Sequence, residues 1–141
     1  MTRHECEAKS REDAWTRNYD ALDTLESSIG KFVAEGNVRH NEARKHFVEG
    51  CRFYAEGEKF VAQRDRLQAK INKFRAEGSS TKTTAAEYRI YRRLGDLHSA
   101  GRKCFVKGRE SHAIGCRIFA EAERLHAEGV NIRRVSELLL K

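Results

Sequence analysis

The feature that most constrains the fold is a seven-residue segment that occurs twice, 65 positions apart. Residues 50–56 (GCRFYAE) and 115–121 (GCRIFAE) are identical at five of seven positions. The same offset pairs glycine or alanine with glycine or alanine at four successive heptad positions. We call these eight residues the small-residue ladders: Gly36, Ala43, Gly50 and Gly57 in the first half, and Gly101, Gly108, Gly115 and Ala122 in the second.

Such ladders predict helices that lie close together. Glycine inside a helix costs roughly 1 kcal/mol relative to alanine, so a row of glycines suits a face where another helix approaches closely. Seven-residue spacing keeps one face toward one partner, as in a left-handed coiled coil. Sustained two-residue alternation is absent, which argues against strands. We predict an all-α fold, an antiparallel helical hairpin or bundle of coiled-coil type, built from two internally duplicated halves whose helix–helix interface contains the ladders.

The expected organisation is a single helical domain over residues 1–141, with a flexible tail at 1–9 and halves at 10–77 and 84–141. Two pairs have the spacing of a capping box, in which an N-cap oxygen and a returning carboxylate satisfy free amides of the first turn. These pairs are Ser10 with Asp13 and Thr84 with Glu87.

An alternative reading comes from the tripeptide Ala-Glu-Gly, which ends at Gly36, Gly57 and Gly78 with a spacing of 21 residues. If each glycine ended a helix, helices of about twenty residues would form a compact bundle. Because 21 residues are three heptads, long helices explain the same spacing, and we favour them. The pair Gly36-Asn37 would be the strongest break, and residues 78–81 form the best loop.

Residues 124–139 resemble the first two helices of a helix-turn-helix DNA-binding unit, with Gly129 at the turn and a short amphipathic helix after it. The resemblance covers only this segment and includes no recognition helix. It therefore implies a helix stop at Gly129 but no sequence-reading function.

The charge of the chain limits the kinds of partner that it is expected to bind. The 141 residues include 28 Lys and Arg against 21 Asp and Glu, a net charge of +7, and the pI is about 9.4. A basic chain of this size favours a polyanionic partner, either nucleic acid or an acidic protein surface. The alternative is an ordinary solvated helix face.

The densest positive charge lies at residues 89–109. At about 100° per residue, five of its cations share an arc of about 100° beside the apolar stripe of the same helix. We call these five the basic stripe: Arg89, Arg92, Arg93, Lys103 and Lys107. Spaced cations can follow a phosphate backbone, and Tyr88 could stack on a base. Because no Asn or Gln cluster accompanies them, we expect contacts to the backbone of the polyanion and not to base edges.

Two functional classes follow. The first is a non-enzymatic accessory or regulatory factor that binds nucleic acid or a nucleic-acid-handling complex. The second is an adaptor or inhibitor that binds an acidic face of another protein without contacting nucleic acid. Catalytic motifs such as Gly-x-Ser-x-Gly and His-Glu-x-x-His are absent from the sequence, so we predict no enzyme activity. A hairpin has little core, so we also predict a homo-oligomer.

Metal and disulfide signals are weak. His112 and Cys116 share a helix face, but the counterpart of His112 in the first half is Phe47. Glu123 and His126 have the Glu-x-x-His spacing of carboxylate metal sites, which normally occurs in two copies. We predict no metal and no cofactor. Cysteine can act as a small apolar residue, so we expect Cys51 and Cys116 to be buried beside the ladders.

No uninterrupted apolar run exceeds three residues, as at residues 138–140, and the polar first residues lack a signal-peptide apolar region. These observations predict no membrane association and a cytoplasmic location.

Overall fold

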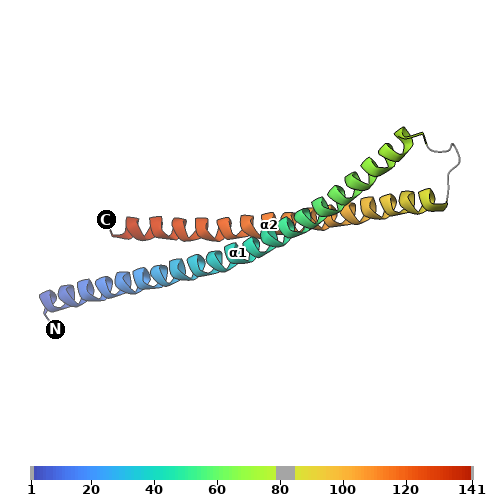
Figure 1. Cartoon of the computed structure of the whole chain (residues 1–141). Helices are drawn as coiled ribbons and strands as arrows, with labels where there is room; N and C mark the ends of the chain where they lie inside the picture. The colour runs from blue at the N-terminus through green and yellow to red at the C-terminus, as the bar shows by residue number, and fades with distance from the viewer. Residues whose placement is uncertain (1, 79–84, 141) are drawn as a thin grey trace. The chain divides into compact units, whose positions relative to one another are not determined.

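The computed structural model describes residues 2–78 and 85–140, which form two long helices packed against each other (Figure 1). Helix α1 is Arg3–Ala76 and helix α2 is Ala85–Leu139. Gly50 lies against Gly108, whereas Gly57, further along α1, lies against Phe105 and Gly101 of α2. Residue numbers therefore fall along α2 as they rise along α1, so the helices are antiparallel. The predicted all-α hairpin is confirmed.

The first helix begins at a capping box that we did not predict. The Glu5 amide donates to Thr2 Oγ1 over 3.2 Å, and the Thr2 amide donates to Glu5 Oε2 over 2.7 Å. This reciprocal pair satisfies amides that the first helical turn leaves free. The predicted start at Ser10 is wrong: Ser10 lies inside α1, and residues 3–9, expected in a tail, are helical. Thr84 lies outside the described residues, and Glu87 lies in the first turn of α2.

The end of α1 follows the usual chemistry of helix C-termini. Gly78 has a φ of +80°, a left-handed conformation that glycine adopts without a steric penalty. Its amide donates to the Arg75 carbonyl over 3.3 Å, which satisfies one of the carbonyls that the last turn leaves free. The loop predicted at residues 78–81 falls mainly outside the described residues.

The reading in which each Ala-Glu-Gly ends a helix is wrong at Gly36 and Gly57, because both lie inside α1. Gly129 likewise lies inside α2, so the helix-turn-helix resemblance does not extend to a turn. All three glycines are buried against side chains. The missing side chain therefore makes room for a neighbour in the hairpin instead of ending a helix.

The chain divides into two compact units. Unit 1 consists of residues 1–43 and 117–141, and unit 2 consists of residues 44–116. Each unit takes one piece from α1 and one from α2. The units therefore differ in extent from the predicted halves at 10–77 and 84–141, which correspond to the helices themselves.

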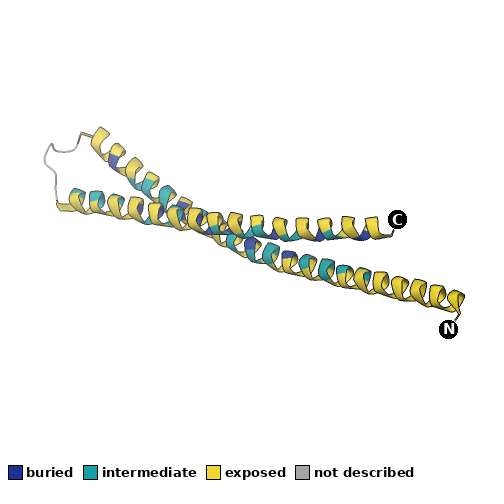
Figure 2. Ribbon diagram, turned by 180° about the vertical axis from the view of Figure 1, so that it is seen from behind, coloured by how far each residue is buried: buried dark blue, intermediate teal, exposed yellow. Residues whose placement is uncertain are grey.

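Burial is confined to the facing sides of the helices (Figure 2). The buried apolar residues among those described are Ala43, Ile71, Leu97 and Ala122, and the structure has no large, fully buried side chain there. Buried Ser136 donates its hydroxyl to the Ile132 carbonyl over 3.1 Å, which satisfies it within its own helix. Two helices share a seam and not a three-dimensional core, so most side chains are exposed.

Candidate functional site

The two units carry charge of opposite sign. Unit 2 contains 17 Lys and Arg against 8 Asp and Glu, a net charge of +9. Unit 1 contains 11 Lys and Arg against 13 Asp and Glu, a net charge of −2. The excess positive charge of the chain therefore belongs to residues 44–116, where it attracts anions before contact is made.

All five residues of the basic stripe are exposed, and all lie on the part of α2 that belongs to unit 2. No ion pair joins them to an acidic side chain among the described residues. Lys107 places its Nζ 5.7 Å from the centre of the Phe53 ring, and Arg52 of α1 lies 5.4 Å from the same ring. Helix α1 thus adds a cation beside the predicted stripe.

A second basic feature is a groove between the two helices of unit 2, which we call the arginine groove. Its cations are Arg64 of α1 and Arg102 and Arg109 of α2. It is also lined by Tyr54, Val61, His98 and Phe105. Arg102 and Arg109 are seven residues apart and follow the ladder glycines 101 and 108 directly, so both lie at the same edge of the seam.

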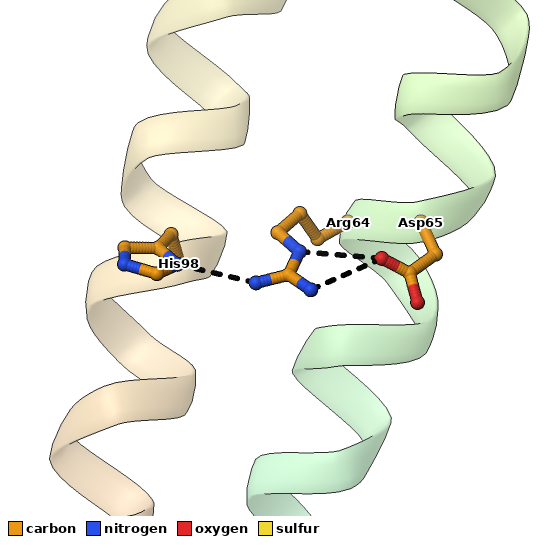
Figure 3. Close-up of polar contacts among 3 residues, drawn as sticks. All are labelled: Arg64, Asp65 and His98. Atoms are coloured by element: carbon orange, nitrogen blue, oxygen red, sulfur yellow. Dashed lines mark hydrogen bonds and ion pairs between the residues drawn. The ribbon is translucent and has the colours of Figure 1, made fainter.

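Arg64 bridges the two helices within this groove (Figure 3). Its Nη1 lies 3.2 Å from His98 Nδ1 on α2, and its Nη2 and Nε lie 3.1 Å and 3.3 Å from Asp65 Oδ1. A guanidinium can only donate, so His98 Nδ1 is the acceptor and the proton of the neutral ring is on Nε2. Asp65 thus holds the Arg64 guanidinium in place, and the Arg64 side chain is about one-third exposed.

The sequence did not identify the arginine groove. Arg102 and Arg109 belong to the basic segment at 89–109, but they lie outside the arc of the basic stripe. Their partners Arg64 and Tyr54 are on the other helix, and only the register of the hairpin brings the four residues together. A signal in the sequence that could have indicated the groove is the heptad spacing of Arg102 and Arg109, each of which follows a ladder glycine.

The eight ladder residues are all buried. At the tightest backbone approach, a Cβ atom added to Gly50 would lie 3.1 Å from the Gly108 carbonyl oxygen. Gly57 and Gly115 lie instead under the rings of Phe105 and Phe47, and Gly36 lies under the ring of His126. The glycines therefore make room for backbone at one position and for aromatic or imidazole rings at others.

The cysteines differ from expectation. Cys51 and Cys116 are exposed, so the predicted burial beside the ladders is wrong. Each follows a buried glycine, and one step along a helix turns the next side chain away from the seam by about 100°. No disulfide joins any two of the cysteines within residues 2–78 and 85–140. The His112 ring packs on Phe47 with centroids 5.1 Å apart, and the His112–Cys116 pair does not belong to a three-donor cluster among the described residues.

Within the described residues, neither helix is long and apolar enough to cross a membrane. In comparisons with known proteins, no family model, curated protein or solved structure matches this chain.

Proposed function

We propose that this chain is a non-enzymatic helical protein that binds nucleic acid through unit 2, as an accessory or regulatory factor. The observation that carries the proposal is the concentration of a +9 charge in residues 44–116, against −2 in the remainder. Cations that neutralise phosphates release condensed counterions, which drives binding to any nucleic-acid sequence. Because the net positive charge is confined to unit 2, it also favours encounters in which the nucleic acid meets unit 2.

Two features of unit 2 support a nucleic acid over an ordinary solvated surface. The basic stripe is exposed and free of ion pairs among the described residues, so binding a phosphate breaks no internal pair. The arginine groove combines three arginines with Tyr54 and Phe105, and aromatic rings beside arginines suit the bases of a single strand. Backbone contacts of this kind position a nucleic acid without reading its sequence.

The test is charge reversal with a matched control on the same helix. Reversing Arg92 and Arg93 to Glu removes two exposed cations of unit 2. Reversing Arg133 and Arg134 to Glu makes the same change in net charge in unit 1, again at exposed positions. We expect the first variant to bind single-stranded and duplex probes at least tenfold more weakly, and the second to differ little from the parent.

Circular dichroism should show unchanged helicity in both variants, because all four arginines are exposed. Equal weakening by both pairs would mean that only net charge matters and would contradict a site in unit 2. Binding to an acidic protein without any binding to nucleic acid would favour the adaptor function instead.

We also infer that the two halves arose by duplication and pair as a coiled coil. Support comes from burial: every ladder position separated by the 65-residue offset is buried in both halves, and so are Ile71 and Ser136, which the same offset relates. A sustained seven-residue period of buried positions is the pattern that coiled coils require.

Self-association is a further part of the proposal. The exposed apolar side chains of unit 1 include Trp15, Tyr19 and Leu138–Leu140, each more than half exposed. Trp15 and Tyr19 stack on each other at 5.6 Å, which makes a compact apolar patch. Patches of this kind are typical of association surfaces. A cytoplasmic location stays a prediction.

A further inference from the structure

Unit 1 brings two imidazoles and one carboxylate together across the two helices. His40 comes from α1, and Glu123 and His126 come from successive turns of α2. One potential ligand atom from each residue lies within 4.8 Å of the others. We propose that these three residues bind a divalent transition-metal ion, and that zinc is the metal that suits them best.

The donor set is one that zinc accepts. Two imidazole nitrogens and one carboxylate oxygen can supply three positions of a tetrahedral shell, and water can supply the fourth. With bonds of about 2.0–2.2 Å, tetrahedral donors lie about 3.4 Å apart. His40 Nε2 and Glu123 Oε1 are already 3.1 Å apart. The Glu123 side chain is 56% exposed, so it can rotate to complete the shell and leave one side open to water.

A second observation points to a ligand at the same place. His126 Nε2 is buried and has no hydrogen-bond partner among the described residues. Buried polar atoms in native proteins nearly always have a partner, and a bond to a metal ion would provide one. The His40 and His126 rings lie with their centroids 5.0 Å apart, so the two imidazoles can share one ion.

The surroundings hold the ligands in place. The Phe119 ring meets the His40 ring edge-on, with centroids 4.8 Å apart. Gly36 lies against the Cδ2 and Nε2 atoms of the His126 ring, where any Cβ atom would collide with them. The ladder glycine therefore creates the space that the imidazole occupies. A bound ion would join α1 to α2 within unit 1, and this proposal is independent of nucleic-acid binding by unit 2.

The sequence pattern contained two of these three residues. Glu123 and His126 have Glu-x-x-His spacing, but the absent second copy argued against a metal. In the structure the third donor is His40, which comes from the other helix and lies 83 residues away from Glu123 in the sequence.

The first experiment titrates untagged, chelator-stripped protein with zinc by calorimetry and with cobalt by absorption spectroscopy. We expect one equivalent to bind, with tetrahedral cobalt bands and no thiolate charge-transfer band, because the site has nitrogen and oxygen donors only. Saturating zinc should raise the melting temperature by several degrees. A thiolate band would assign the metal to the cysteines and overturn the proposal, as would the absence of binding.

The second experiment uses variants. His40→Gln, Glu123→Gln and His126→Asn should each weaken zinc binding roughly tenfold or more, whereas His112→Gln in unit 2 should not. Gly36→Ala keeps all three ligands but displaces the His126 ring, so it should also weaken binding. Gly30→Ala adds the same methyl group to α1 where no atom lies within 4 Å apart from its chain neighbours and the nearby backbone of its own helix, and should leave the affinity unchanged. If His40→Gln, Glu123→Gln and His126→Asn kept their helicity and bound zinc like the parent, the site would be refuted.

Discussion

At Gly50 the backbones of α1 and α2 leave no space for a large side chain. A Cβ atom there would lie 3.1 Å from the Gly108 carbonyl oxygen and 3.7 Å from Ser111 Cβ. Backbone cannot rotate away as a side chain can. Gly115 is different, because its neighbour is the Phe47 ring, which can change its rotamer.

This contrast predicts a ranking of glycine substitutions. Gly50→Leu should lower the free energy of unfolding by about 1–3 kcal/mol through overpacking, and Gly115→Leu should cost less. Gly30→Ala should instead stabilise by about 0.5–1 kcal/mol, because the added group meets no atom within 4 Å apart from its chain neighbours and the nearby backbone of its own helix.

Urea denaturation of the three variants measures these differences directly. If Gly50→Leu were as stable as the parent, close approach at the ladder would not be the reason for its glycines.

Patterns that lie along a single helix can be read from the sequence, whereas contacts that depend on the partner helix cannot. The ladders were visible because small residues at heptad spacing need no knowledge of the register. The arginine groove and the His40 cluster were not visible, because each depends on which turn of α1 faces which turn of α2. The burial predicted for Cys51 was wrong because this residue comes one position after a ladder glycine, and one step along a helix turns its side chain away from the seam.

At the scale of the helices, continuity was predicted but the beginning of α1 was not. The favoured long-helix interpretation holds because the internal glycines are packed against neighbours, which offsets their poor helix propensity. The beginning of α1 was missed because two capping boxes compete in the sequence, at Thr2 and at Ser10, and the helix extends to the earlier one. Helical spacing alone cannot distinguish a capped start from an interior serine.

The first turns of α1 depend on this cap, because they pack against little. Every described residue before Leu22 is exposed, and most of the stability of a helix in a protein comes from tertiary packing of its apolar face. We predict that in the monomer, at a protein concentration too low for self-association, backbone amides of residues 6–21 exchange with solvent much faster than those of residues 46–60, which line the seam. Native-state hydrogen exchange followed by mass spectrometry measures both segments in one experiment.

Thr2→Ala removes the N-cap oxygen and should accelerate exchange in residues 6–12 while leaving residues 46–60 unchanged. Equal protection of the two segments in the parent would contradict this prediction. Protection of residues 6–21 that appears only at higher protein concentration would instead show that a second copy covers the beginning of α1, as the proposed self-association requires.

For the whole molecule, the separation of charge into a +9 unit and a −2 unit is the property that the proposed function uses. The sequence showed a basic chain with an acidic beginning. It did not show that these acidic first residues belong to the same unit as the end of α2, because only the pairing of the two helices brings them into one unit. The net charge of residues 44–116 exceeds that of the complete chain, so an average over the chain underestimates the attraction to phosphate.

The most direct test of this account is the salt dependence of binding to unrelated single-stranded and duplex probes, followed by fluorescence anisotropy. If the five cations of the basic stripe each neutralise one phosphate, the logarithm of the duplex binding constant should fall against the logarithm of salt concentration with a slope of about −4 to −5. The slope should be similar for all duplex sequences. Reversal of Arg92 and Arg93 should reduce its magnitude by about two. No binding at low salt, or binding that salt does not weaken, would contradict the account.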